Sequence, residues 1–164
     1  MNSAGNAENL PEINRVIAAA IIITSDNGIV MGLKDPTGGG VYPDAWHIPG
    51  GGVNEGESLK EAALREAHEE VLGLDTDSAT ITHLEVTGEG EATKTLKDGR
   101  RVWCRMHFNY FEIRAPLSAA ELSEQIRPGD DLVELRVVMP NELGDLQQIP
   151  GGRELFVKMG YLKK

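Results

Sequence analysis

A helix that follows a glycine-rich turn constrains this chain more than any other feature. The segment Gly51–Leu74 reads GGVNEGESLKEAALREAHEEVLGL. Its second half, residues 59–72, contains no Gly or Pro and is rich in Ala, Leu, Glu, Lys and Arg, which predicts an α-helix. Ser58 and Glu61 have the spacing of a capping box, and Gly73 is placed to form a left-handed C-terminal cap.

The expected helix carries three carboxylates on one face. Glu66, Glu69 and Glu70 stand at positions i, i+3 and i+4, and an apolar stripe lies about a quarter-turn away. That stripe consists of Ala63, Leu64, Ala67 and Val71. Like charges at this spacing repel, and a hard divalent cation such as Mg²⁺ or Mn²⁺ is the simplest way to offset the repulsion. The alternative is a solvated acidic face, which is the usual role of such a helix surface.

The spacing of the residues around these acids is specific. Gly51 is followed after five residues by Glu57, and after seven more by Arg65-Glu66-Ala67-His68-Glu69-Glu70. This pattern resembles the Nudix box, G-x5-E-x7-R-E-U-x-E-E-x-G-U, in which U is aliphatic. The upstream Trp46 and Pro49-Gly50 are also similar to that family.

Two positions depart from the box. Ala67 is a small residue for the aliphatic position, and one extra residue precedes the closing Gly73-Leu74. The insertion changes how the helix ends and leaves the spacing of the acids untouched.

The resemblance implies an enzyme that hydrolyses a phosphoanhydride bond in a nucleoside diphosphate linked to another group. The implied cofactor is Mg²⁺, with Mn²⁺ as the alternative. The implied metal ligands are the carbonyl of Gly51 and the carboxylates of Glu66, Glu69 and Glu70. Arg65 would hold the loop by pairing with Glu57, and Gly50 would support the site with them.

The catalytic group implied by the resemblance comprises Arg65, Glu66, Glu69 and Glu134. Glu69 itself could act as the general base. An acid from residues 129–134 could instead reach in before the next strand, with Glu134 and Asp131 as the candidates. The alternative for these two residues is an acidic turn that serves solubility.

Composition indicates one globular domain of residues 10–164 after a flexible tail of residues 1–9, since the chain has 164 residues and is 40% hydrophobic. The net charge of −10 argues against nucleic acid or an anionic membrane as partner. The apolar run at residues 16–24 is too short to span a bilayer. The single Cys104 fits a reducing cytosol, so a cytoplasmic location is expected. A homodimer, common in the resembled family, is compatible with the sequence.

The strand and turn pattern predicts an α+β fold. Strands are expected at residues 15–24, 29–33, 80–91, 101–113 and 133–139, and helices at 117–126 and 151–161, with a helical turn at 140–143. Asp26-Asn27-Gly28 and Asp98-Gly99 predict hairpins. Residues 34–45 are expected to form a loop at the edge of the pocket, or a plain connector. The resemblance implies an α/β/α sandwich with a mixed β-sheet between helices.

The strand at residues 101–113 alternates between two faces. Trp103, Arg105, His107, Asn109 and Phe111 share the face that mixes aromatic and hydrogen-bonding groups. We predict that Arg105 and His107, together with Trp46, bind substrate; the alternative is an amphipathic strand with its polar face in water. Cys104, on the other face, is expected to be a buried thiol, and His68 to be a surface residue.

Three functions are compatible with this reading. The first is a pyrophosphohydrolase of nucleoside triphosphates, the second a hydrolase of nucleoside diphosphate sugars or dinucleoside polyphosphates, and the third a non-catalytic nucleotide sensor. ADP-ribose hydrolases of the resembled family tend to carry a proline soon after the box, and here no proline occurs between Pro49 and Pro116. The tyrosine that marks dinucleoside polyphosphate hydrolases is also missing. These absences favour a small-molecule nucleoside triphosphate as the substrate.

Overall fold

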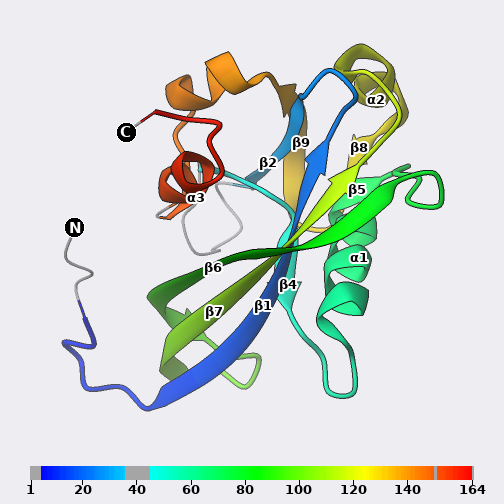
Figure 1. Cartoon of the computed structure of the whole chain (residues 1–164). Helices are drawn as coiled ribbons and strands as arrows, with labels where there is room; N and C mark the ends of the chain where they lie inside the picture. Colours follow the sequence, from blue (N-terminus) through cyan, green and yellow to red (C-terminus); the bar gives the residue numbers. More distant parts are fainter. Residues whose placement is uncertain (1–4, 36–44, 150, 164) are drawn as a thin grey trace.

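The protein is an α/β/α sandwich with a mixed sheet in the middle, as predicted. The computed structural model describes residues 5–35, 45–149 and 151–163. Helix α1 (Leu59–Glu70) covers one face of the sheet, and helix α3 (Gly152–Lys158) lies on the other (Figure 1). Positions 36–44 of the expected pocket-edge loop lie outside the described residues. Among the helices of the described ranges, none has the length and apolar character needed to cross a bilayer.

The main sheet is built around one long central strand. Its strands, in spatial order, are β3 (Trp46–His47), β2 (Ile29–Lys34), β1 (Glu12–Ile23), β7 (Arg101–Arg114) and β6 (Thr80–Thr95), with β4 (Gly50–Gly52) paired to β1 and β9 (Leu132–Val138) paired to β2. Strands β1 and β7 run parallel, and the other pairs in this sheet are antiparallel. Two short strands, β5 (Val71–Leu72) and β8 (Arg127–Pro128), form a second small sheet. The strands expected from the sequence are all present, and the short strands β3, β4, β5 and β8 were not anticipated.

The first hairpin forms where the sequence predicts it. Ile23 pairs with Ile29, and Asn27 adopts a φ of 69°, a left-handed conformation that asparagine tolerates better than most residues. The backbone N–H of Gly28 donates to Thr24 Oγ1 over 2.7 Å, and Thr24 donates to Asp26 over 2.6 Å. The buried Thr24 hydroxyl therefore finds both of its hydrogen-bond partners within the turn.

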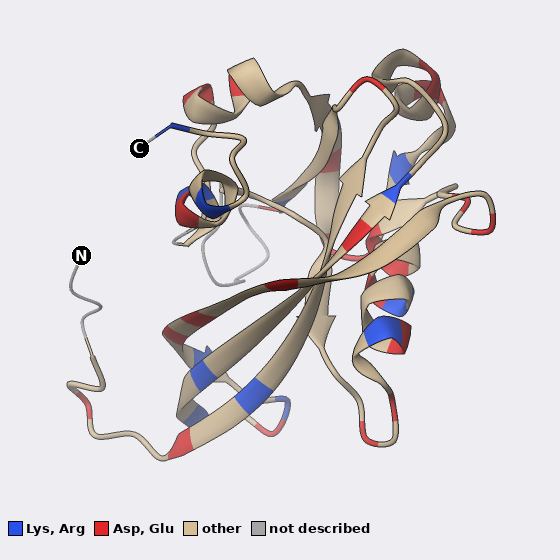
Figure 2. Cartoon of the chain, in the orientation of Figure 1, with Lys and Arg blue, Asp and Glu red and all other residues tan. Residues whose placement is uncertain are grey.

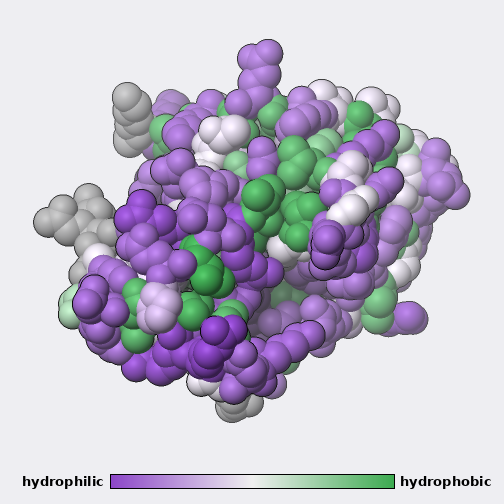
Figure 3. Space-filling view, turned by 90° about the horizontal axis from the view of Figure 1, so that it is seen from below, coloured by the Kyte–Doolittle hydropathy of each residue, from purple (hydrophilic) through white to green (hydrophobic). Residues whose placement is uncertain are grey.

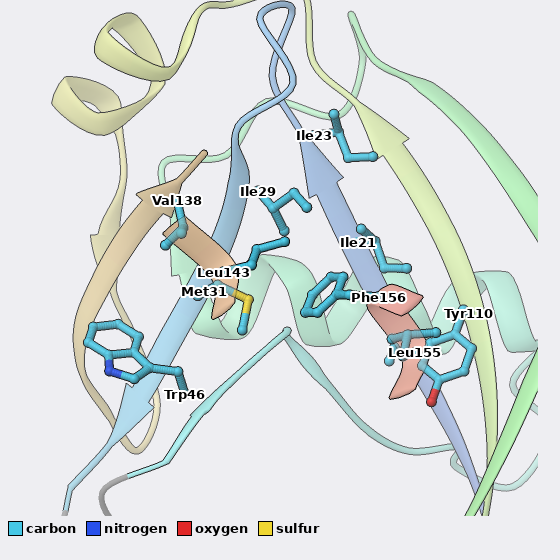
Figure 4. Packing of buried hydrophobic residues seen from close by; sticks show 11 residues of the cluster. Ile21, Ile23, Ile29, Met31, Trp46, Tyr110, Val138, Leu143, Leu155 and Phe156 are labelled. Atoms are coloured by element: carbon cyan, nitrogen blue, oxygen red, sulfur yellow. The ribbon is translucent and has the colours of Figure 1, made fainter. Parts of the chain in front are cut away.

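The alternation of side chains along β1 supplies two cores. Ile21 and Ile23 pack with Phe156 of α3 (Figure 4), whereas Ala20 and Ile22 pack with Ala67 of α1. All four of these β1 residues are 0% exposed, which confirms that this part of the strand is buried on both faces. Seen from below the view of Figure 1, the surface is largely hydrophilic around a central group of apolar residues (Figure 3).

Helix α1 begins as predicted and ends earlier. Ser58 Oγ accepts a hydrogen bond from the N–H of Glu61, and the Glu61 carboxylate accepts one from the N–H of Ser58, so the capping box is confirmed. The helix stops at Glu70 because Val71 and Leu72 pair with β8. Gly73 does have a positive φ of 89°, but it lies beyond the short strand and does not cap the helix directly. The extra residue before Gly73 is thus part of β5.

The remaining helices follow the expected positions. Helix α2 spans Ala119–Gln125 behind a second capping box at Ser118, and a 3₁₀ helix, η1, spans Pro140–Asp145. Near the N-terminus, Asn6 bonds both backbone groups of Leu10, and Glu8 pairs with Arg101 over 2.7 Å. The predicted boundary between a tail and a domain at residues 9 and 10 stays a prediction.

Candidate active site

Arg65 ties the loop before α1 to the helix. Its Nε lies 2.7 Å from Glu57 Oε2, its Nη1 2.8 Å from Glu66 Oε1, and its Nη2 2.9 Å from the carbonyl oxygen of Gly52. The Glu57 carboxylate also accepts from the N–H of Asn54 over 3.0 Å. The hydrogen bonds between Arg65 and Glu57 raise the pKa of the guanidinium and lower that of the carboxyl. The pairing of Arg65 with Glu57 expected from the sequence is therefore present.

The glycines before the helix bring backbone and carboxylates together. Gly51 and Gly50 pair with Ala18 and Ala19 of β1, so this stretch is held as a strand edge. A Cβ on Gly51 would collide with the carboxylate of Glu66. The N–H of Gly50 donates to Glu70 Oε1 over 3.5 Å, a long hydrogen bond. Only a residue without a side chain at position 51 allows Glu66 to lie directly against the strand.

The three predicted acids have different environments. The side chain of Glu69 is 48% exposed and approaches Arg65 only at 3.4 Å, whereas the side chain of Glu66 is 12% exposed. Glu70 is 4% exposed. Burial, followed by the charge of Glu66, raises the pKa of Glu70 to about 9, against the opposing effects of the Gly50 N–H and Lys34. The group thus combines one buried carboxyl, Glu70, with a half-buried one, Glu66, and one that is open to solvent, Glu69.

A family model for the NUDIX domain matches residues 14–158 of this chain. The chain belongs to the Nudix family. Among curated relatives, the nucleoside triphosphatase NudI of Escherichia coli K12 is 34% identical over 88 residues, which is 54% of this chain and 61% of that protein. The chain therefore spans less than two-thirds of the length of this relative. The recognition of the Nudix box in the sequence is confirmed.

Solved Nudix structures share the fold at low sequence identity. The dihydroneopterin triphosphate pyrophosphohydrolase of E. coli has a TM-score of 0.67 at 21% identity, over 89% of this chain and 96% of that one. A Caenorhabditis elegans Ap4A hydrolase has a TM-score of 0.61 at 17% identity, over 89% and 95% of the two chains. These likenesses confirm the predicted sandwich and do not select a substrate.

The residues of the Nudix box fit a divalent cation. Glu70 Oε2 is buried and has no hydrogen-bond partner among the residues that the structure describes. The donors here are carboxylate and carbonyl oxygens, which Mg²⁺ prefers. No group of three or more His, Cys, Asp or Glu side chains within the described ranges is already gathered closely enough to hold an ion.

The two candidate bases outside the helix lie in different surroundings. Glu134 stands opposite Leu33 in the β2–β9 pair and forms an ion pair with Arg136 at 3.1 Å. Asp131, just before β9, is among the charges that raise the pKa of Glu70. Glu134 is not among them. Of the two candidates, only Asp131 thus affects the pKa of a box carboxylate. The assignment of a base to either residue stays a prediction.

The residues predicted to bind substrate lie on opposite faces of the sheet. Trp46 is 8% exposed in the core on the α3 side, with the Arg136 guanidinium 4.8 Å from its ring centre (Figure 4). Arg105 and His107 share the other face with Phe111, which packs against α1. The three residues are thus not brought together, because the strand alternation that places Phe111 on α1 turns Arg105 and His107 away from Trp46.

Arg105 and His107 contact acidic neighbours. Arg105 lies 3.3 Å from Glu91 and 3.5 Å from Glu12, and His107 lies 3.5 Å from Glu89. Together with these glutamates of β6 the two residues line a shallow hollow of about 360 Å³. Its carboxylates would repel a phosphate group, so the contacts favour the alternative of an amphipathic strand with its polar face in water. The predictions for His68 and Cys104 are confirmed: the first is exposed and the second is buried.

His47, which the sequence did not single out, is a buried residue whose pKa is affected by the same Lys34 and Asp131 charges as that of Glu70. The residue is 7% exposed, and its Nδ1 lies 2.8 Å from the carbonyl oxygen of Ile48. A proton on Nδ1 would donate to that carbonyl and leave Nε2 bare, and Nε2 has no partner among the described residues. Burial lowers the pKa of His47, with Lys34 lowering it and Asp131 raising it. No sequence signal marks this residue, because its position depends on the pairing of His47 with Gly32.

Replacing Arg65 by lysine tests its structural role. Lysine keeps the charge but has a single ammonium group, which cannot reproduce the fork that reaches Glu57, Glu66 and the Gly52 carbonyl. After allowing for partial screening by solvent, we expect Arg65→Lys to lower the free energy of unfolding by about 1–2 kcal/mol. Urea unfolding followed by circular dichroism measures this change. Arg100→Lys, in an ion pair with 73% of the arginine side chain exposed, is the control and should have no measurable effect. Equal effects of the two changes would contradict the role assigned to Arg65.

Proposed function

We propose that this Nudix protein is a divalent-metal-dependent pyrophosphohydrolase of nucleoside triphosphates. The observation that carries the proposal is the set of oxygen donors around the Gly51 strand edge, where Glu66 lies against Gly51 and the buried Oε2 of Glu70 has no partner among the described residues. The names of two similar proteins, a nucleoside triphosphatase and a dihydroneopterin triphosphate pyrophosphohydrolase, support a triphosphate as substrate.

The Gly51 carbonyl, Glu66, Glu69 and Glu70 are the groups that would hold the cation. When bound, Mg²⁺ or Mn²⁺ supplies positive charge that stabilises the phosphate oxygens during hydrolysis. Arg65 bonds to the Gly52 carbonyl and to Glu57, and so keeps the strand edge and the helix in one relative position. No other side chain of the group is as open to solvent as Glu69, and this openness makes it our candidate for orienting the attacking water and accepting its proton.

The reaction consumes one water. Its oxygen forms a bond to phosphorus, the bridging P–O bond of the anhydride breaks, and the proton of the water passes to the general base. The products of a nucleoside triphosphate are then a nucleoside monophosphate and pyrophosphate. A nucleoside diphosphate sugar would instead give a nucleoside monophosphate and a sugar phosphate.

A nucleotide panel tests the proposal. Nucleoside triphosphates, nucleoside diphosphate sugars and dinucleoside polyphosphates are incubated with Mg²⁺ or Mn²⁺, and pyrophosphate and phosphate release are measured separately. We expect pyrophosphate from at least one triphosphate, and loss of turnover when a chelator removes the metal. Cleavage of only the other substrate classes would replace the triphosphate assignment. Tight binding of one nucleotide without cleavage would support a sensor instead. A cytoplasmic location and a homodimer stay predictions.

A further inference from the structure

Three basic side chains stand apart from the rest. Arg15, Lys34 and Lys94 are half-buried, and none of them forms an ion pair with a carboxylate within the described residues. Every other Lys or Arg in those ranges is either exposed or ion-paired. Such a group is unusual in a chain of net charge −10, where acidic partners are plentiful. We call Arg15, Lys34 and Lys94 the cationic cluster.

The cationic cluster lies beside the Nudix box. The Arg15 guanidinium packs so closely on Gly52 that a Cβ there would collide with its Nη2. Arg15 pairs with Met106 and Met106 with Gly90, so Lys94, four residues after Gly90 on β6, shares the face of Arg15. Basic positions on the lower parts of β1 and β7 can be followed in Figure 2.

Lys34 links the cluster to the acids electrostatically. It stands at the end of β2, where the register with β9 shifts, and its charge acts on Glu70, on His47 and on Lys94. Burial lowers the pKa of Lys94, and the charges of Arg15 and Lys34 lower it further. Lys94 therefore lies between like charges in a partly dehydrated place, which costs free energy unless an anion is bound.

We propose that Arg15, Lys34 and Lys94 bind the phosphate group of the substrate that the Nudix box does not hold, and so select triphosphates over nucleoside diphosphate sugars. This inference rests on the proposed function. A nucleoside diphosphate sugar has two phosphates, and both are needed at the box, where the bond between them breaks. A triphosphate has a third phosphate, whose charge matches that of Arg15, which lies against Gly52, and of the two lysines of the cationic cluster. The cationic cluster is then a specificity determinant.

Direct binding tests the cluster without any reaction. Inorganic triphosphate and pyrophosphate are titrated into the metal-free protein by calorimetry. We expect Lys94→Met to weaken triphosphate binding about tenfold or more, as for the loss of one charge-assisted contact, and to affect pyrophosphate less. Lys97→Met makes the same charge change at an exposed position after β6 and should leave both affinities unchanged. Equal effects of Lys94→Met and Lys97→Met would overturn the proposal, because only a general charge effect would remain.

Kinetics test the selectivity. For Lys94→Met we expect kcat/KM to fall about tenfold for a nucleoside triphosphate, with the value for a nucleoside diphosphate sugar unchanged. An equal fall for both substrates overturns the role in selection. Arg15→Lys keeps the charge and should retain most of the preference that Arg15→Met loses.

If Lys94→Met does not fold, as judged by its thermal melt, Lys34→Met is measured in its place. If the wild-type protein cleaves no nucleotide, the proposed function fails, and the binding of inorganic triphosphate still decides whether the cationic cluster is an anion site.

Discussion

Glu69→Gln is expected to lower kcat/KM for a nucleoside triphosphate by about 10²–10⁴-fold, the usual contribution of a positioned general base. Glutamine keeps the size of the side chain and removes its ability to accept a proton at neutral pH. The side chain is 48% exposed and contacts Arg65 only at 3.4 Å, so the fold does not depend on its charge. The thermal melt should therefore remain unchanged while turnover falls.

The measurement is steady-state hydrolysis at saturating Mg²⁺, with binding of the nucleotide followed separately. Glu124→Gln, an exposed glutamate of α2, is the matched control and should retain full activity. Unchanged turnover in Glu69→Gln would remove this residue from the mechanism and direct attention to Asp131 and Glu134. A loss of activity with a lowered melting temperature would instead indicate a structural role.

Glu70→Gln is expected to stabilise the metal-free protein at pH 8 by a few kcal/mol and to have little effect near pH 4.5. Burial and the charge of Glu66 raise the pKa of Glu70 to about 9 in the folded protein, whereas the same carboxyl ionises near 4.5 when unfolded. Between these values the folded state binds more protons than the unfolded state. The wild-type protein therefore loses stability as pH rises through this window, and a neutral glutamine does not.

Urea unfolding in the presence of a chelator, at pH 4.5 and pH 8, measures the difference. Addition of Mg²⁺ at pH 8 should stabilise the wild-type protein more than Glu70→Gln, because an ionised Glu70 is a better ligand than an amide. Glu124→Gln again provides the control, without a pH-dependent change in stability. A stability difference between wild type and Glu70→Gln that is the same at both pH values would contradict the raised pKa.

Local signals were sufficient for the start of the helix and for the hairpins. The Ser58 capping box and the Asp26-Asn27-Gly28 turn depend on residues within four positions of one another, so their geometry follows from the sequence alone. The pairing of Arg65 with Glu57 is similarly local, because one helix and its preceding loop contain both partners. The short strand β4 was not predicted, because its three glycines have no side chains and so cannot show the alternation of apolar and polar residues that indicates a strand.

Contacts between distant segments could not be read in this way. Glu66, Glu69 and Glu70 share a helix face, yet their burial differs because β4 lies against Glu66 and Glu70 and leaves Glu69 open. The cationic cluster joins three strands whose register decides which side chains meet. The separation of Trp46 from Arg105 likewise depends on the face of the sheet to which each side chain points. A single sequence does not determine this for two segments about 60 residues apart.

The parallel pairing of β1 with β7 has a consequence for biosynthesis. Glu12 aligns with Trp103 and Ile23 with Arg114, so the central strand acquires this neighbour only after most of the chain has left the ribosome. Until then the isoleucine-rich end of β1, with Ile21, Ile22 and Ile23, has an open edge on that side, and such edges recruit other chains. Nascent chains are therefore most prone to aggregate before β7 emerges, and a chaperone that shields β1 would act in that interval.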